Sequence, residues 1–556
     1  MNHFEPVADT VYLLKTPFSI VWSGVVLIRG TENILIDSGA DSETVDRQII
    51  PALAELGLKP SDIRWLTVTH CHGDHIGGLP RLKAITGAQI AAYEGSAPKL
   101  VDPKPYSADV RAAFPADSPA VPSGLCSTPA DLLLPDGGML AGRLQLIHTP
   151  GHDDDCVSWY DADTQTLITG DSVQGNGTPT QGIAFYRNLP DYIRSIRRLQ
   201  TMRIEHLVCA HDYDGIGAVI HGRDAVRQAL AFCLTQVERY EAFVRAAGPD
   251  AEIGETADRL IGEMGCGKPE KRFMAMYTVR EHQRGTAASL LRKTVLITGA
   301  SHGIGAAAAV AFAKAGYHVG INYCNTPDGA AETAEKCRAL GAEAEIFQAD
   351  VRDRSACEQM VRAFIARFGK IDVLINNAGG ALKIPGGTEG CFEEMPMDYW
   401  DSQIALNLSA AAYCARYAAE DMIARCTRGK IINVSSIHSE VTWVHRRMLP
   451  YSAAKGGLNM LTKALGVELI RHGINVNGVA PGLIFTKLAE RYSPADLASF
   501  SRKIPYGNGG TVDDITPMLL FLADDTKSRF IVGQTFMIDG GQSIDGSIES
   551  MNFPLS

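Results

Sequence analysis

The sequence lacks the features that would indicate a membrane span, a nucleic-acid partner or a disulfide framework. A long uncharged stretch at 294–313 is interrupted by glycines, Ser301 and His302, so it predicts a strand, a turn and a helix. No lysine or arginine run occurs, and 52 basic against 63 acidic residues give a net charge of -11, which disfavours nucleic acid. The twelve cysteines are scattered without a CxxC pair, so we expect reduced, mostly buried thiols. Small molecules are therefore the expected partners.

The 556 residues are long enough for at least two hydrophobic cores. Two different patterns of predicted strands and helices divide them. Up to about residue 215, short β-rich runs with turns and a few helices indicate a layered sheet sandwich flanked by helices, and residues 222–243 show apolar side chains at helical spacing. From Lys293 onward, apolar strands alternate with helices, which is typical of a parallel doubly wound sheet. We expect an α/β protein with domains 1–290 and 291–556, joined by a polar linker at 281–292.

A histidine-rich segment at 69–75, Thr-His-Cys-His-Gly-Asp-His, follows an apolar strand. Alternate residues His70 and His72 can face one metal ion, while Asp74 and His75 turn toward a second. Such nitrogen and oxygen donors suit Zn²⁺. A mere surface loop is disfavoured, because further candidate ligands recur at the ends of later strands: His152, Asp171 and His211.

This set of residues resembles the metallo-β-lactamase superfamily over about residues 8–245. The resemblance implies an αββα sandwich with a dinuclear site between its sheets. It places the first zinc on His70, His72 and His152, the second on Asp74, His75 and His211, and makes Asp171 the bridge. Structural or packing roles are expected for the nearby His148, His206, His221 and Cys71.

Two adjacent cations would lower the pKa of a bridging water from ~16 to near neutrality, which makes hydroxide available. The predicted reaction is hydrolysis of an ester, lactone, thioester or amide, with Asp74 among the catalytic residues. The presence of both Asp74 and His75 favours the hydrolytic branch of the superfamily over its mononuclear iron branch. Tyr186 could supply an oxyanion donor, although a packing role is favoured.

A glycine-rich turn opens the second half. Residues 294–298 form an apolar strand, and Gly299, Gly303 and Gly305 would then let backbone amides approach a pyrophosphate at the start of a helix. Similar polar or glycine segments follow the later strands. The residues expected to bind NADP or NAD are Gly299, Ser301, His302, Gly303, Ile304, Gly305, Tyr323, Asp350, Val351, Asn377, Ala378, Gly379, Tyr451, Lys455, Pro481, Gly482 and Thr486.

Tyr451 and Lys455 are four residues apart and therefore share one helical face, where the lysine can lower the pKa of the phenol. A strand ending in Ser435 and Ser436 can supply a hydroxyl for the substrate oxygen. These residues resemble the short-chain dehydrogenase/reductase family over about residues 292–545. The resemblance implies that Ser436 orients the substrate, Tyr451 transfers the proton, Lys455 binds ribose and Asn407 supports a proton relay.

The second half departs from that family in one spacing. Fifteen residues separate Ser436 from Tyr451, about two more than the family leads us to expect, so Ser435 stays an alternative. The inserted residues 443–449 either shape substrate access or form a plain surface loop. The second strand ends at 320–324 without an acidic residue, so nothing there repels a 2′-phosphate, and NADP is slightly favoured over NAD.

The two halves together predict a bifunctional enzyme. Ser435, Ser436, Ile437 and His438, with Trp443 downstream, are similar to the sugar 1-dehydrogenase branch of the reductase family, whose product is a lactone; the zinc half would then be a lactonase. The alternatives are a thioesterase joined to a 3-ketoacyl-type ketoreductase, and a reductase with a non-catalytic metal-binding module. The reductase resemblance implies a homo-oligomer. A start that carries acidic residues and no secretory signal predicts a cytoplasmic location.

Overall fold

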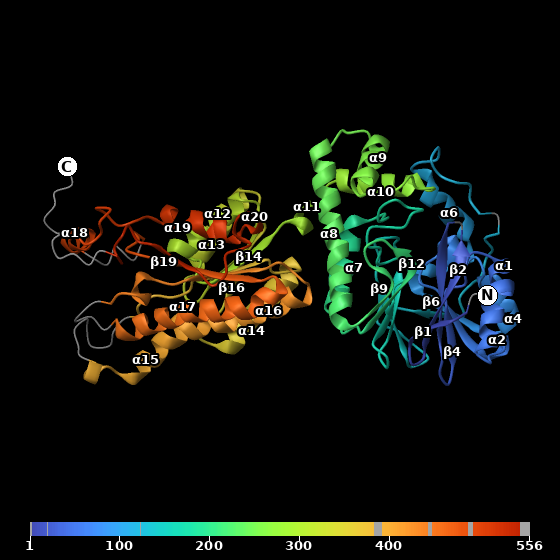
Figure 1. Cartoon of the computed structure of the whole chain (residues 1–556), viewed down its shortest axis with the longest axis horizontal. Helices are drawn as coiled ribbons and strands as arrows, with labels where there is room; N and C mark the ends of the chain where they lie inside the picture. Colours follow the sequence, from blue (N-terminus) through green and yellow to red (C-terminus); the bar gives the residue numbers. More distant parts are fainter. Residues whose placement is uncertain are drawn as a thin grey trace. The chain divides into compact units, whose positions relative to one another are not determined.

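The computed structural model describes residues 3–18, 20–122, 124–382, 392–442, 448–486 and 493–544. The chain forms two compact units, Met1–Leu291 and Arg292–Ser556 (Figure 1). None of the helices in these described ranges combines the length and hydrophobicity that crossing a bilayer requires.

The first unit contains two sheets. One has seven strands in chain order: β1 (Glu5–Ala8), β2 (Val11–Phe18), β3 (Val21–Ile28), β4 (Asn33–Ile36), β5 (Ile63–Thr67), β6 (Gln89–Tyr93) and β7 (Leu132–Leu134). The other has six: β8 (Met139–Leu140), β9 (Leu144–His148), β10 (Val157–Asp161), β11 (Thr166–Ile168), β12 (His206–Tyr213) and β13 (Gly217–His221). Its strand order is β13-β12-β11-β10-β9-β8.

The helices of the first unit cover the outer faces of the two sheets (Figure 1). Short helices lie between the early strands and longer ones follow β11: α1 (Ser42–Thr44), α2 (Ile50–Glu55), α3 (Gly73–Ile76), α4 (Leu79–Thr86), α5 (Ala97–Val101), α6 (Pro103–Ala112), α7 (Leu189–Gln200), α8 (Arg223–Ala247), α9 (Ile253–Glu263), α10 (Arg272–Gln283) and α11 (Ala288–Leu291).

Strand alternation explains the four layers. In β2, Val11 and Leu13 join the core shared by the two sheets, whereas Leu14 joins the core beneath the outer helices. Successive side chains of a strand point to opposite faces, so a strand that is apolar at every position is buried on both sides. The second sheet behaves likewise, with Val208 facing the first sheet and Leu207 facing α7 and α8. The expected αββα sandwich is therefore confirmed.

The predicted linker at 281–292 begins too early, because its first three residues are still helical. Residues 281–283 belong to α10, and Glu281 and His282 are buried at 3% and 4% exposure. The His282 ring contacts Tyr186 Oη at 2.7 Å and Glu241 Oε2 at 2.8 Å. His282 thus makes buried contacts within the first unit, whereas residues 284–286 are exposed as a connection would be.

The second unit is built on one parallel sheet, as expected from its alternating pattern. The strands are β14 (Thr294–Ile297), β15 (His318–Tyr323), β16 (Ala344–Gln348), β17 (Val373–Asn376), β18 (Lys430–Val434), β19 (Asn475–Pro481) and β20 (Thr535–Ile538). Their order is β16-β15-β14-β17-β18-β19-β20. In β14, Val295 and Ile297 face one helical layer and Leu296 faces the other.

Helices cover both faces of this sheet (Figure 1). One layer contains α12 (Gly303–Lys314), α13 (Pro327–Ala339), α19 (Val512–Ala523) and α20 (Asp525–Ser528). The other contains α14 (Arg354–Phe368), α15 (Met397–Ile404), α16 (Ala410–Ala424) and α17 (Leu449–Leu469), while α18 (Pro494–Ser501) follows β19. The carboxyl ends of the parallel strands are left for polar residues, which is where ligands bind in such sheets.

Candidate functional site

All seven side chains predicted as metal ligands come together in the first unit. They lie on the loop after β5 and the helix α3 that follows it, on the loops after β9 and β11, and on β12 itself. Within each of two groups, one ligand atom per residue lies within 4.8 Å of the others: His70, His72, His152 and Asp171 in one, and Asp74, His75 and His211 in the other.

Asp171 joins the two groups. Its Oδ2 faces the Nε2 atoms of His70 and His152 at 3.9 and 3.4 Å. Its Oδ1 faces the Nε2 atoms of His75 and His211 at 3.7 and 3.4 Å. One carboxylate thus offers each oxygen to a different set of histidines, which is the arrangement that a bridging ligand requires.

The other ring nitrogen of each histidine faces a polar atom outside the cluster. Such outer contacts fix which nitrogen carries the proton and which is available to an ion. The contacts are His70 Nδ1 to Thr69 Oγ1 (3.2 Å), His75 Nδ1 to Asp37 Oδ2 (2.8 Å), His152 Nδ1 to Phe185 O (3.0 Å), His211 Nδ1 to Trp22 O (2.5 Å) and His72 Nε2 to Asp153 Oδ2 (3.3 Å).

Several inward-facing atoms lack hydrogen-bond partners, and this tests whether the residues fit a metal. Nε2 of His70, Nε2 of His75 and Oδ1 of Asp171 are buried with no hydrogen-bond partner among the described residues. Buried polar atoms are normally paired, so these orphans indicate that the protein alone does not satisfy the cluster. Imidazole nitrogens and carboxylate oxygens are donors that Zn²⁺ accepts. The residues fit a pair of zinc ions.

The electrostatics of the second group indicate a need for positive charge. Burial acts to lower the pKa of His75, but Asp74, Asp37 and Asp171 outweigh it and raise that pKa to about 9. Burial acts to raise the pKa of Asp74, but His75, His211 and Lys271 hold it well below its usual value. The carboxylates are therefore balanced by protonated imidazoles, whose charge a bound cation would replace. Lys271, next to α10, is a contributor that the sequence analysis missed.

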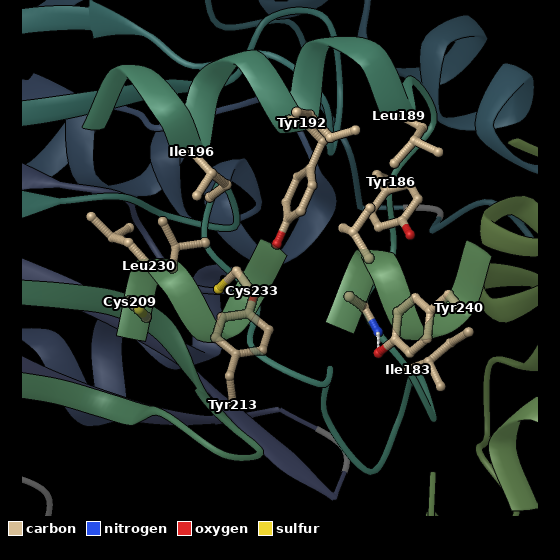
Figure 2. Close-up of a cluster of buried hydrophobic side chains, with 14 of the residues drawn as sticks. Ile183, Tyr186, Leu189, Tyr192, Ile196, Cys209, Tyr213, Leu230, Cys233 and Tyr240 are labelled. Atoms are coloured by element: carbon tan, nitrogen blue, oxygen red, sulfur yellow. Dashed lines mark hydrogen bonds between the residues drawn. The ribbon is translucent and has the colours of Figure 1, made fainter. Parts of the chain in front are cut away.

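Tyr186 does not supply a phenol to this centre. Its side chain is fully buried in the core under α7 and α8, and its hydroxyl contacts His282 (Figure 2). The packing role favoured from the sequence holds, and the oxyanion role does not.

A different tyrosine lies at the cluster. Tyr213 packs edge-on against His211 with ring centroids 5.7 Å apart, and burial together with Asp171 raises the pKa of its phenol well above the usual value. His211 and Tyr213 are two residues apart on β12, so they share a face of the strand. That spacing was the signal available in the sequence.

The surroundings of Asp171 need glycine at position 170. Gly170 adopts φ +52°, and a Cβ there would lie 2.4 Å from Thr69 Oγ1. The loop after β11 can approach the histidine segment only because this side chain is missing.

His148, His206, His221 and Cys71 do not belong to the two ligand groups and contact other residues. His148 stacks on Tyr93, His206 and His221 contact each other at 2.8 Å, and Cys71 is buried with its thiol directed to Ser96 O.

The glycine-rich turn of the second unit lies between β14 and α12. Gly299 and Gly303 have φ values of +63° and +61°, which glycine adopts without strain. A Cβ at Gly305 would lie 2.5 Å from both Asn377 Nδ2 and Gly299 O, and one at Gly303 would be 3.7 Å from Thr486 Cγ2. The turn therefore lies against the segments after β17 and β19, as a dinucleotide site needs.

Two hydroxyl groups hold this turn. Thr326 Oγ1 donates to Ser301 Oγ at 2.7 Å, and Ser301 Oγ contacts His302 Nδ1 at 2.9 Å. Asp350, expected near the adenine end, is paired with Arg352 at 2.6 Å. Burial, together with Asp350, raises the pKa of Cys324, and Arg352 opposes this rise. Ala349 N donates to Tyr323 O at 2.9 Å, so the segment that carries Asp350 and Arg352 begins beside the end of β15. Thr326 and Arg352 were not predicted from the sequence.

Ser436, Tyr451 and Lys455 come together at the end of β18 and the start of α17. Burial raises the pKa of Tyr451, and a hydrogen bond with Ser436 opposes this. Ser435 lies differently, because its hydroxyl donates to Lys455 O at 3.3 Å. The structure therefore favours Ser436 over Ser435 as the partner of the tyrosine.

Lys455 does not lower the pKa of the phenol here as the sequence analysis expected. Its Nζ lies 5.7 Å from the centroid of the Tyr451 ring and donates to Val434 O at 2.8 Å. Burial lowers the pKa of Lys455 to about 8.

Asn407 is buried beside this centre. Its Oδ1 accepts from Gly380 N at 2.8 Å, and its Nδ2 donates to Gln403 Oε1 at 2.8 Å. A Cβ at Gly379 would lie 2.8 Å from Asn407 Oδ1 and 3.2 Å from Lys455 Nζ. Asn407 and Lys455 thus flank the same glycine, and Gln403 is a supporting residue that the sequence analysis missed. The inserted residues 443–447, with Trp443, His445, Arg446 and Arg447, lie outside the described residues.

Comparisons with known proteins agree with both halves. Residues 16–211 match the model of the metallo-beta-lactamase superfamily, and residues 299–543 match a family described as enoyl-(acyl carrier protein) reductase. Over 254 residues the chain is 35% identical to 3beta-hydroxysteroid dehydrogenase 1 of Eggerthella lenta, covering 45% of this chain and 94% of that protein. The chain is a fusion of a metallo-β-lactamase superfamily domain with a short-chain dehydrogenase/reductase domain.

Other relatives match the same dehydrogenase/reductase domain. The 3-oxoacyl-[acyl-carrier-protein] reductase FabG of Staphylococcus aureus is 34% identical over 251 residues, which are 45% of this chain and 98% of that protein. The crystal structure of acetoin dehydrogenase YohF from Salmonella typhimurium is similar at 32% identity, 45% and 96% coverage and a TM-score of 0.41. The fusion expected from the sequence is confirmed, and the chain is an enzyme with a hydrolase domain and an oxidoreductase domain.

Proposed function

We propose that the hydrolase domain is a dinuclear zinc lactonase and that the oxidoreductase domain is an NAD(P)-dependent sugar or alcohol dehydrogenase that forms the lactone. The observation that carries the proposal is Asp171, whose two oxygens face two separate histidine groups in a chain that also holds Ser436, Tyr451 and Lys455. Both centres act on carbonyl chemistry, and one chain supplies them together.

In the hydrolase domain, His70, His72 and His152 would hold one zinc and Asp74, His75 and His211 the other, with Asp171 between them. Two bound zinc ions would supply hydroxide near neutral pH and polarise a substrate carbonyl. The chain's own task is to hold the ligand nitrogens in place, which the outer contacts of each imidazole perform. Asp74, whose side chain is 16% exposed, is the carboxylate ligand best placed to take up and release protons.

In the oxidoreductase domain, the Ser436 hydroxyl would hold the carbinol oxygen and Tyr451 would accept its proton. Bound NAD(P)⁺ would supply the acceptor for the hydride of the C–H bond, so that a hemiacetal carbon would become the carbonyl carbon of a lactone. Lys455, whose ammonium lies beside Gly379, would bind the ribose of the cofactor. No acidic residue ends β15, and Arg352 lies nearby, which supports NADP over NAD.

Opening of the lactone explains why the two domains are useful in one chain. Oxidation of a hemiacetal is readily reversed, whereas hydrolysis of the lactone to a carboxylate at neutral pH removes the product. Hydrolysis therefore draws the oxidation forward without any passage of intermediate between sites. Small molecules are the proposed partners.

The test compares the full chain with His70→Ala. Purified protein is screened for NAD(P)⁺ reduction across aldoses and hydroxy acids, and the products of an oxidised sugar are then analysed. The wild-type chain should deliver the open acid, while the variant should accumulate lactone and stall earlier. Absence of lactone in the variant would contradict the proposal, and zinc analysis of the wild type checks the metal centre independently.

A second candidate is favoured by the relatives of the oxidoreductase domain. Matches to FabG support a ketoreductase for acyl chains, with the hydrolase domain as a thioesterase. Assays of 3-ketoacyl thioester reduction and thioester cleavage, run beside the lactone assays, distinguish the two. A preference for thioesters by orders of magnitude would select this alternative.

A homo-oligomer formed through the oxidoreductase domain is also proposed. Helix α17 exposes Met460 at 63% and Val467 at 77%, and apolar side chains of this kind are often covered by another subunit. Light scattering of the full chain tests it.

A further inference from the structure

His72 is the least enclosed imidazole of the first metal group. Its side chain is 14% exposed, against 0% for His70 and 1% for His152. It also faces the cluster through Nδ1, which lies 3.0 Å from His152 Nε2, and not through Nε2. Its ring orientation therefore depends on what contacts the outward-facing Nε2.

The contact at that nitrogen is a carboxylate. Asp153 Oδ2 lies 3.3 Å from His72 Nε2, and the Asp153 side chain is only 2% exposed. A negative charge at this position favours the imidazole tautomer with its proton on Nε2, which leaves the Nδ1 lone pair for an ion.

Three further side chains hold Asp153 itself. Arg187 Nη1 donates to Oδ2 at 3.0 Å and Lys99 Nζ to Oδ1 at 3.3 Å, while the Tyr106 hydroxyl also donates to Oδ2. These three donors fix the carboxylate of Asp153 in position.

The segment between β6 and β7 provides much of this support. Helix α5 carries Lys99 and helix α6 carries Tyr106. The Lys99 ammonium lies over the Tyr106 ring, with Nζ 3.9 Å from the ring centroid. The Tyr106 and His72 rings are nearly parallel, at 17°, with centroids 6.0 Å apart. The α5–α6 segment thus reaches the metal group through His72 and Asp153.

The neighbouring carboxylates do not form a third metal site. Asp153, Asp154 and Asp155 lie close together, but Lys99 Nζ contacts all three. The ammonium occupies the position that a cation would take. Lys99 therefore serves to hold Asp153, and Asp154, with a side chain 82% exposed, is the outermost member.

We infer that Asp153 is a positioning residue that sets the affinity of the first zinc through His72. The inference rests on the proposed zinc centre and names a residue outside the ligand set. Loss of an outer partner of a ligand histidine typically weakens metal affinity about 10- to 100-fold. The effect should fall on the first zinc alone, because the structure shows no contact of Asp153 with Asp74, His75 or His211 among the described residues.

The experiment measures zinc binding by the full chain in competition with a chromophoric chelator. The variants are Asp153→Ala and Asp153→Asn, and the matched control is Asp154→Ala, which removes a Lys99 contact from the adjacent position without touching His72. Asp153→Asn keeps the volume and one acceptor oxygen, so it remains informative if the alanine variant fails to fold. Oxidoreductase activity of the same preparations and thermal unfolding of the metal-free proteins report folding.

The wild type and Asp154→Ala should each bind two zinc ions, and the affinity for each ion should agree between the two proteins within about twofold. Asp153→Ala should bind one zinc normally and the other about 10- to 100-fold more weakly, with Asp153→Asn in between. Equal weakening of both zinc ions, or wild-type affinity in both Asp153 variants, would overturn the inference and leave the zinc centre standing. A wild type that binds no zinc would instead refute the proposed function.

Discussion

Lys455 should lose its positive charge at an unusually low pH. The side chain is 3% exposed and burial lowers its pKa to about 8. A lysine with that pKa is roughly 90% protonated at pH 7 and roughly 10% protonated at pH 9, whereas an ordinary lysine is still about 95% protonated at pH 9.

Cofactor affinity should follow this charge. If anionic NAD(P) binds only the protonated form, the apparent Kd scales inversely with the protonated fraction and should rise about tenfold between pH 7 and pH 9. Tyr451 stays neutral over this range, because burial raises its pKa above the usual value. Fluorescence titration of the full chain at constant ionic strength, from pH 6.5 to 10, measures the effect.

Two variants act as controls. Lys455→Met should bind cofactor weakly at every pH, and Lys455→Arg should bind without the change near pH 8, because a guanidinium stays charged. A wild-type Kd that is constant from pH 7 to 9, or a midpoint near pH 10, would refute the reasoning.

The lowered pKa of Lys455 also determines how the free energy of unfolding changes with pH. The unfolded chain keeps the lysine proton up to about pH 10.4, but the folded chain releases it near 8, so between these values the unfolded state binds more protons. The free energy of unfolding of the oxidoreductase domain should therefore rise with pH across this window, relative to Lys455→Met. The full lowering corresponds to about 3 kcal/mol. Chemical denaturation at pH 7.5 and 10 measures the difference.

Three further substitutions test the two sites. Tyr451→Phe should lower dehydrogenase turnover about 10²- to 10⁴-fold with cofactor Kd and hydrolysis unchanged, and more than roughly a hundredth of the activity remaining would count against proton transfer by this phenol. Asp171→Ala should lower zinc content below two per chain and abolish hydrolysis; normal turnover with unchanged zinc would exclude the bridge. Gly379→Ala places a Cβ 2.8 Å from Asn407 Oδ1 and 3.2 Å from Lys455 Nζ. That overpacking should cost about 1–3 kcal/mol and at least tenfold in dehydrogenase activity, with hydrolysis as the unaffected control.

Local spacing explains how much of the sites the sequence could reveal. His70, His72, Asp74 and His75 lie within six residues, and Tyr451 and Lys455 share one helical turn, so periodicity alone groups them. Short β-rich runs separated by turns likewise predicted the sandwich, and the alternation of apolar strands with helices predicted the parallel sheet.

Contacts between residues far apart in the sequence could not be predicted from local spacing. Asp153 meets Lys99 across 54 residues and Tyr106 across 47, and no spacing rule connects them. Tyr186 was considered for the metal site because it follows Asp171 in sequence, yet its backbone directs it to His282. Tyr213 is near the metal cluster through strand alternation from His211, a pattern that was present but not used. The polar residues 281–283 suggested a linker because a buried ion-paired histidine and an exposed one have the same letter.

Each of the two units contains all the strands of its own sheets, and this has a consequence during synthesis of the chain. Every strand of both sheets of the hydrolase domain precedes residue 222, and α8 to α11 complete its core by Leu291. At a translation rate of about 5–20 residues per second, the 265 residues from Arg292 to Ser556 take about 13–50 s to follow. The metal cluster can thus assemble, and acquire its ions, on a nascent chain whose second sheet still lacks its edge strand β20. The order of the two domains along the chain thereby sets an order of synthesis, in which the hydrolase domain is complete before the oxidoreductase domain.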